Sequence, residues 1–172
     1  YNGNGICDEG EASNDTDGDA CSANCSSEPN AIFVGQYHAC ATTHHGPAYC
    51  WGYGNRGQLG QGANDSSDVP TRLRTPVVIQ GGRPGVPGRQ IATHFTSLAV
   101  GAYHTCGIAE EGGHVFCWGW NNYGQRAAGG RSETTNSPNL VGNLSNITAV
   151  GLGAFHSCAV DQAGEVNCWG RN

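Results

Sequence analysis

The chain has 172 residues, of which 28 are glycine and only 13% are charged, and its net charge is −6. All eight basic residues are arginine, so the chain lacks the basic footprint of a nucleic-acid-binding protein, and no apolar run is long enough for a membrane span. Abundant glycine and the scarcity of helix-favouring runs predict an all-β domain of many short strands.

Residues 1–30 form a segment rich in cysteine and acidic side chains. Asp15, Asp17 and Asp19 alternate around a glycine, a spacing that supplies the oxygen ligands calcium prefers. Ser26 stands where a complete calcium loop has its glutamate, and the alternative is a solvated acidic turn. The number of cysteines is odd, so one thiol is left either free or bonded to another chain. The cysteines are Cys7, Cys21 and Cys25.

The acidic run DTDGDACSANC resembles thrombospondin type 3 calcium repeats. It is also similar to the cysteine-rich repeats of secreted myxobacterial-type proteins. Both resemblances imply a secreted protein, and the first implies bound calcium. The chain begins with Tyr1 rather than methionine, from which we expect a processed protein or a piece of a longer one.

The remaining residues contain one motif three times. Each copy reads His-x-Cys, then about ten residues rich in glycine and polar groups, then Cys-Trp-Gly, and a lead-in such as VGAYH precedes it. Such self-similarity indicates a repeat architecture, which decides the fold. The units are 31–97, which includes an insertion at 63–90, then 98–146, and a truncated third unit at 147–172.

Each copy of the motif predicts a β-hairpin closed by a disulfide. Facing residues of an antiparallel pair lie about 4.5–5.5 Å apart, which suits a disulfide, and closing a loop of this length adds roughly 3 kcal/mol. Zinc is the weaker alternative, because no fourth ligand is evident. Regular cysteine pairs place the protein outside the reducing cytosol. The predicted pairs are Cys40–Cys50, Cys106–Cys117 and Cys158–Cys168.

Histidine and tryptophan also recur at fixed positions of the motif. We expect the repeated imidazoles to be buried and hydrogen-bonded to backbone groups, and the repeated indoles to pack in the core or between units. Trp120 lies outside the repeated position, so it is predicted to be exposed for binding. The repeated residues are His38, His104 and His156, with Trp51, Trp118 and Trp169.

The insertion at 63–90 holds four of the seven prolines and is locally basic. The favoured interpretation is a solvated surface loop. The alternative is a docking surface for an acidic partner, such as the N-terminal segment of another copy, because long ordered loops often carry binding. The basic residues are Arg72, Arg74, Arg83 and Arg89.

The motif Val-Gly-x-x-His-x-Cys, the Trp-Gly and the run NRGQLGQG at 55–62 together resemble the regulator of chromosome condensation repeat family. With its paired cysteines, the chain is similar to secreted bacterial members of this family. The resemblance implies a β-propeller-like repeat of about three four-stranded blades. Because closed propellers need about four to eight blades, this one is incomplete or is completed by other chains.

No serine, cysteine or histidine arrangement suggests a nucleophile with its base, and we expect a protein that is not an enzyme. The leading hypothesis is an extracellular or cell-surface structural protein whose repeats self-assemble head to tail into a filament or ring. The alternative is a secreted propeller module that binds protein or glycan and belongs to a longer chain. Calcium is the one cofactor expected, and the expected partners are further copies or another extracellular molecule.

Overall fold

A computed structural model describes residues 29–44, 46–74, 76–80, 89–92, 94–127, 134–142 and 144–171. Within these ranges the chain forms thirteen β-strands, so the predicted all-β class is confirmed. Among these residues there is no helix whose length and apolar character would let it cross a membrane.

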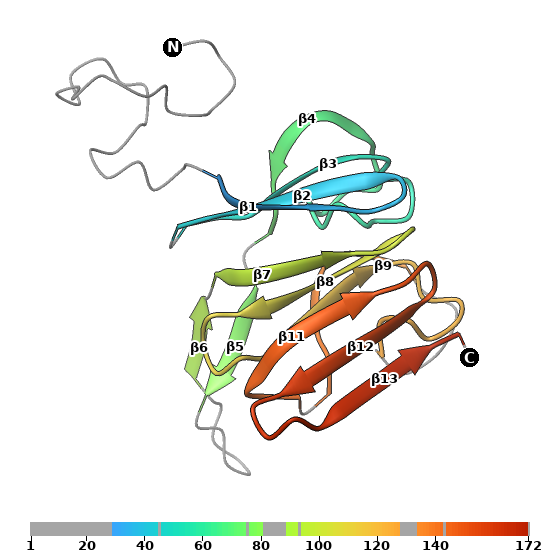
Figure 1. The fold of residues 1–172 in the computed structure, drawn as a ribbon. Coiled ribbons are helices and arrows are strands. Elements are labelled where there is room, and N and C mark those ends of the chain that lie inside the picture. Colours follow the sequence, from blue (N-terminus) through green and yellow to red (C-terminus); the bar gives the residue numbers. More distant parts are fainter. Residues whose placement is uncertain are drawn as a thin grey trace, which may run out of the picture.

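Three antiparallel sheets follow one another along the chain (Figure 1). Sheet 1 has the strand order β1-β2-β3-β4, sheet 2 the order β10-β9-β8-β7, and sheet 3 the order β11-β12-β13. Sheet 1 consists of β1 (Pro29–Val34), β2 (His38–Thr43), β3 (Tyr49–Gly52) and β4 (Ser67–Arg72). Sheet 2 consists of β7 (Phe95–Val100), β8 (His104–Ala109), β9 (Val115–Gly119) and β10 (Thr135–Leu140). Sheet 3 consists of β11 (Ile147–Leu152), β12 (His156–Asp161) and β13 (Val166–Gly170).

The predicted insertion at 63–90 is shorter than the sequence indicated. Its residues Ser67–Arg72 form β4, which pairs with β3 as the fourth strand of sheet 1. A separate hairpin of β5 (Val77–Gln80) and β6 (Arg89–Ala92) follows before sheet 2 begins. Polar composition and Pro70 made β4 look like a loop, but both suit an edge strand with an exposed outer face.

The structure contains the three predicted hairpin disulfides. Cys40 faces Cys50, Cys106 faces Cys117 and Cys158 faces Cys168 in the strand registers, with Cα atoms 4.0, 4.1 and 4.1 Å apart. The glycine of each Cys-Trp-Gly is required by the backbone. Gly119 has a φ of 97°, and a Cβ there would lie 2.5 Å from the Tyr103 carbonyl oxygen.

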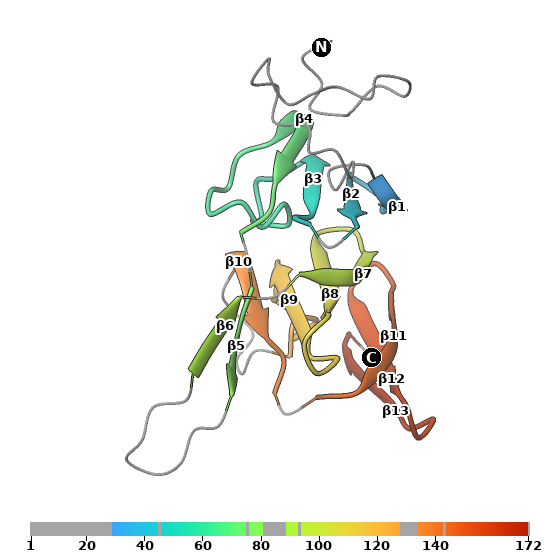
Figure 2. The same cartoon turned by 90° about the vertical axis from the view of Figure 1, so that its left-hand side faces the viewer.

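The sheets stack in chain order (Figure 2), and both contacts between neighbours use the same two faces. The face that carries the disulfide, which we call the disulfide face, points toward the next sheet in sheets 1 and 2. The opposite face carries aliphatic residues of the first strand, and in sheets 2 and 3 it packs against the previous sheet; we call it the aliphatic face. The first core joins Cys40 and Cys50 to Leu98 and Trp118.

The second core repeats this arrangement one sheet further along. Cys106 and Cys117 of sheet 2 share a cluster with Ile147 of sheet 3, against which Val150 and Leu152 also pack. Because apolar burial is the main driving force for folding, each sheet is stabilised largely by its neighbours, as in other repeat proteins. Among the residues that the structure describes, no sheet packs on the disulfide face of sheet 3 or on the aliphatic face of sheet 1.

Candidate functional site

A buried hydrogen-bond relay joins sheet 1 to sheet 2. His38 Nε2 lies 2.7 Å from Thr105 Oγ1. The Thr105 hydroxyl in turn donates a hydrogen bond to the backbone carbonyl oxygen of Gln58 at 2.8 Å. The Trp118 indole N–H donates to the same carbonyl at 2.8 Å. Because the hydroxyl proton is committed to Gln58, the His38 proton must be on Nε2.

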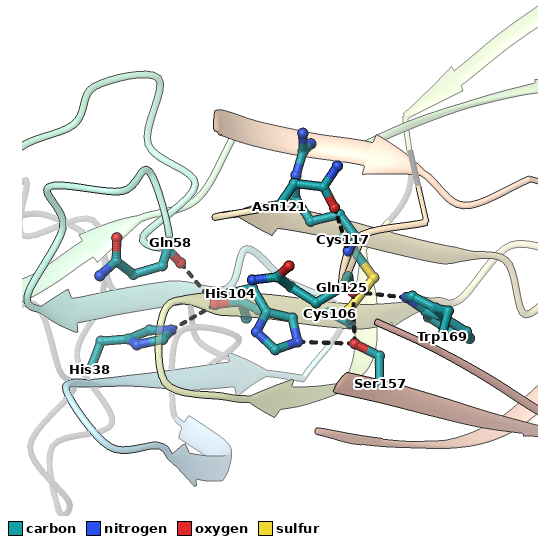
Figure 3. The surroundings of a disulfide bond; sticks show 11 residues. His38, Gln58, His104, Cys106, Cys117, Asn121, Gln125, Ser157 and Trp169 are labelled. Carbon is teal, nitrogen blue, oxygen red and sulfur yellow. Dashed lines mark hydrogen bonds between the residues drawn. A yellow bond between two sulfur atoms is a disulfide. The ribbon is translucent and has the colours of Figure 1, made fainter. Parts of the chain in front are cut away.

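The same relay joins sheet 2 to sheet 3 (Figure 3). His104 Nε2 lies 2.9 Å from Ser157 Oγ, the Ser157 hydroxyl donates to the Gln125 carbonyl, and the Trp169 indole N–H donates there as well. A histidine, a hydroxyl, a carbonyl and an indole therefore recur at each boundary between sheets.

Burial keeps the two relay histidines neutral. Desolvation lowers the pKa of His38 to about 4. Desolvation is also the main cause that lowers the pKa of His104 to about 3, and nearby His38, His156 and Arg126 lower it further. A neutral imidazole is the form that the relay needs, because its Nε2 donates one hydrogen bond to the hydroxyl. The relay histidines are thus structural groups that connect neighbouring sheets.

The glutamines of the relay also hold the loops at the molecular surface. The side-chain oxygen of Gln58 accepts a hydrogen bond from the Arg56 backbone N–H at 2.9 Å. The side-chain oxygen of Gln125 accepts one from the Tyr123 backbone N–H at 2.9 Å. Each glutamine therefore links the inter-sheet relay, through its backbone, to a loop that carries an exposed side chain.

Those loops form an aromatic–arginine surface across all three sheets. The residue before each relay-type histidine contributes one ring per sheet. The Tyr37 and Tyr103 rings stack with centroids 4.8 Å apart, and the Tyr103 and Phe155 rings with centroids 6.5 Å apart. Further rings pack beside this row. The surface consists of Tyr37, Tyr53, Arg56, Tyr103, Trp120, Tyr123, Phe155 and Arg171.

Both arginines of this surface lie over its rings. The Arg56 guanidinium is 5.9 Å from the Trp120 ring centroid, and that of Arg171 is 5.0 Å from the Tyr123 centroid. Such cation–π contacts hold each guanidinium against the rings at the surface. A hydrogen bond with the Tyr37 side chain is the largest of the causes that raise the pKa of Tyr103.

The Tyr103 ring is stacked between Tyr37 and Phe155, and the other ring pairs meet tilted or edge to face. Ring edges, hydroxyl groups and guanidinium N–H groups are therefore among the groups that this surface offers a ligand. Tyr37, Tyr53, Tyr123 and both arginines are exposed. Its two formal charges are both positive, on a protein whose net charge is −6. Tyrosine, tryptophan and arginine are the side chains that dominate protein recognition surfaces.

The predicted site residues are only partly brought together. Trp120 was expected to be exposed, but it is half-buried within the aromatic–arginine surface. Arg72 is the last residue of β4 and Arg74 lies two residues beyond it. Both are exposed, and neither is among the arginines over the rings. Arg83, Asp15, Asp17, Asp19, Cys7, Cys21, Cys25 and the side chain of Arg89 lie outside the described part of the chain.

The repeated histidines differ from one another in their surroundings. His38 and His104 are buried as predicted, and their Nε2 atoms bond to hydroxyls of the next sheet. His156 is exposed, because it lies on the open disulfide face of sheet 3. Sequence reasoning missed the aromatic row, although an aromatic residue precedes each of the three histidines.

The regulator of chromosome condensation (RCC1) repeat model matches residues 45–108 and 112–160, and a second model of this repeat matches 95–125. The chain belongs to the RCC1 repeat family. Its three sheets are therefore RCC1 blades, of which the third has three described strands. The predicted family is confirmed, and with it the β-propeller architecture.

Two relatives are about one-third identical to this chain over the residues that match. The ultraviolet-B receptor UVR8 of Arabidopsis thaliana is 32% identical over 142 residues, which is 82% of this chain and 29% of the receptor. The human E3 ubiquitin-protein ligase HERC2 is 34% identical over 138 residues, which is 78% of this chain and 3% of the ligase. The chain thus spans less than a third of either relative.

Solved RCC1 structures share the fold. Yeast RCC1 (Prp20), solved in complex with Kap60, superposes with a TM-score of 0.61 at 22% identity. The match covers 83% of this chain and 32% of that protein. A structure of Prp20p from Saccharomyces cerevisiae gives the same TM-score at 23% identity, with 83% and 33% covered.

Proposed function

We propose that this chain is a non-catalytic protein-binding module, and that it binds an acidic protein surface through its aromatic–arginine surface. The observation that carries the proposal is the continuous row of Tyr37, Tyr103 and Phe155, flanked by two arginines. Rigid aromatic side chains lose little conformational entropy on binding. Guanidinium groups already held in place pair well with carboxylates.

A protein partner suits this surface better than a glycan does. Stacking on a sugar requires open ring faces, whereas the Tyr103 ring at the centre of the row lies between the rings of Tyr37 and Phe155. The positive charge of Arg56 and Arg171 favours a partner that carries carboxylates. The acidic balance of the rest of the chain would steer such a partner toward this surface.

We place this module outside the cell or at the cell surface. Three disulfides close hairpins in the structure, and such bonds persist in oxidising compartments. This location also fits a secreted, disulfide-containing member of the RCC1 family, with the Asp15–Asp19 run as its calcium site.

Panning a random peptide display library on the folded chain tests the binding proposal. Peptides selected by the wild type are expected to be enriched in aspartate and glutamate. The double variant Tyr103→Ala/Trp120→Ala should lose most of their binding, because rings at the centre of an interface contribute most of its affinity. Arg74→Ala removes an exposed arginine outside the surface and is the matched control.

Selected peptides that show no enrichment in aspartate and glutamate would refute the binding proposal. Peptides that bind the Tyr103→Ala/Trp120→Ala variant as well as the wild type would refute it too. A parallel glycan array separates the two partner classes, since glycan binding that depends on Tyr103 and Trp120 would contradict a protein partner.

A further inference from the structure

Three tyrosines meet within the aromatic–arginine surface. Tyr37 and Tyr53 belong to loops of sheet 1 and Tyr103 to a loop of sheet 2, and each ring contacts the other two. The Tyr37 and Tyr103 rings are the nearest pair, with centroids 4.8 Å apart and planes inclined by 29°. The Tyr53 ring lies 6.3 Å from Tyr37 and 6.2 Å from Tyr103, at steeper angles. Tyr37 and Tyr103 are therefore two phenols held side by side across a boundary between sheets.

The hydroxyl groups of this pair also meet. A side-chain hydrogen bond joins Tyr37 to Tyr103 and is the largest cause that raises the pKa of Tyr103. Because the rings are stacked and their hydroxyls are in contact, the ring carbons next to the two hydroxyls lie close together. These are the carbons at which phenoxyl radicals couple. The pair thus has the arrangement that a carbon–carbon bond between two oxidised tyrosines requires.

The other rings around Tyr103, in the part of the chain that the structure describes, are less suited to such a bond. Phe155 stacks on Tyr103 with centroids 6.5 Å apart, but it has no hydroxyl from which a phenoxyl radical could form. Trp120 meets Tyr103 edge to face. Tyr103 itself is half-buried, so part of its ring is open to an oxidant in solution.

We propose that Tyr37 and Tyr103 are an oxidative cross-linking site, at which hydrogen peroxide and a haem peroxidase join the two rings into dityrosine. Each phenol loses one electron and one proton, and the two radicals form a bond between the ring carbons next to their hydroxyls. The hydrogen atoms on those carbons then move to the oxygens, which restores both phenols. The two electrons and two protons released reduce one molecule of hydrogen peroxide to two molecules of water.

The fold supplies the proximity that this reaction needs. Radicals on separate molecules must meet by diffusion, whereas these two rings are already in contact, so coupling within the chain is favoured over coupling between chains. The product is a covalent link between sheet 1 and sheet 2. Because Tyr37 and Tyr103 are far apart in the sequence, the link also restricts the unfolded chain and stabilises the contact between two blades. The inference does not depend on the proposed binding partner.

Treatment of the folded chain with hydrogen peroxide and a haem peroxidase, followed by mass spectrometry, tests the proposal. The product should have the mass of one chain less two hydrogen atoms and should show the blue fluorescence of dityrosine. After reduction of the disulfides, cleavage at arginine should leave fragment 1–56 joined to fragment 90–126. Each of these fragments contains both cysteines of its own hairpin disulfide, so those bonds cannot account for the link.

Two phenylalanine variants identify the partner of Tyr103, because fragment 1–56 also contains Tyr53. Tyr37→Phe keeps the ring but removes the phenol, and it should lose the joined fragments. Tyr53→Phe is the matched control and should form them as the wild type does.

Four results would overturn the proposal. They are a wild type that forms no dityrosine, products linked only between chains, a link that persists in Tyr37→Phe, and a link that is lost in Tyr53→Phe. The stabilising role has its own measurement, since the cross-linked chain should unfold at a higher denaturant concentration than the untreated chain. Equal midpoints would contradict a covalent link that holds two blades together.

Discussion

His38 and Thr105 are 67 residues apart in the sequence, and a 2.7 Å hydrogen bond joins them across the boundary between two blades. The same relationship holds for His104 and Ser157 at the next boundary. In both cases the hydroxyl in turn donates a hydrogen bond to the backbone carbonyl of a glutamine. The hydroxyl residue that follows His104 and His156 is thus a structural determinant of the contact between blades.

Thr105→Val should lower the free energy of unfolding by about 2 kcal/mol. The substitution keeps the shape of the side chain but leaves the His38 N–H without its acceptor in a buried site. Thr105→Ser retains the hydroxyl and is the matched variant, so it should lose much less. Denaturant unfolding of both variants measures the difference, and equal losses would show that the hydroxyl contributes little.

Acidification should destabilise the fold before most carboxylates titrate. The pKa values of His38 and His104 are about 4 and about 3 in the folded chain, against about 6.5 when unfolded. The unfolded chain therefore binds more protons as the pH falls below about 6.5. The contribution of the two neutral histidines to the free energy of unfolding is therefore complete above about pH 6.5. It is lost toward pH 4 for His38 and toward pH 3 for His104, by on the order of 3 kcal/mol each.

Unfolding curves between pH 7 and pH 5 isolate this effect. His38→Gln retains an N–H donor but cannot titrate, so its stability should fall less steeply with acidification than that of the wild type. His44→Gln replaces an exposed histidine and serves as the control. An unchanged slope in His38→Gln would contradict the assignment of acid sensitivity to the relay.

The three disulfides should differ in their rates of reduction. Cys40, Cys50, Cys106 and Cys117 are 0% exposed, whereas Cys168 lies open to solvent. Because thiol–disulfide exchange requires access of the reductant to sulfur, the Cys158–Cys168 bond should be reduced first in dilute protein. Mass spectrometry after mild reduction and alkylation identifies the labelled cysteines. Simultaneous labelling of all three pairs would argue against an order set by burial.

Gly119→Ala should lower the free energy of unfolding by about 2–5 kcal/mol. Its φ of 97° disfavours a side chain, and a Cβ would lie too close to the Tyr103 carbonyl and to His104. Gly151 provides a control on the exposed side of β11, where a Cβ meets nothing within 4 Å. Thermal melts of the two alanine variants should therefore diverge, and similar melting temperatures would refute the proposed constraint.

The sequence predicted what local spacing determines. Cys158 and Cys168 flank a short turn with a glycine, so the hairpin and its disulfide follow from a few neighbouring residues. The threefold recurrence of this pattern then indicated the repeat and its family. Strand β4 was missed, because an edge strand with polar residues and Pro70 has the composition of a loop.

The hydrogen-bond partners and the exposed surface were not predictable in the same way. The partner of His38 belongs to the next repeat, and only the stacking of sheets reveals which side chain faces it. The aromatic–arginine surface similarly combines three positions of the repeat that are separated along the chain. Its one sequence signal was the aromatic residue before each histidine, which by itself resembles an ordinary core position.

The two roles of Gln58 and Gln125 have a consequence for how such proteins diversify. Each glutamine fixes a surface loop with its side chain and a neighbouring repeat with its backbone. Duplication or deletion of one whole repeat would therefore add or remove one relay together with one loop of the aromatic–arginine surface. The length of that surface is thus tied to the number of repeats, in whole-number steps.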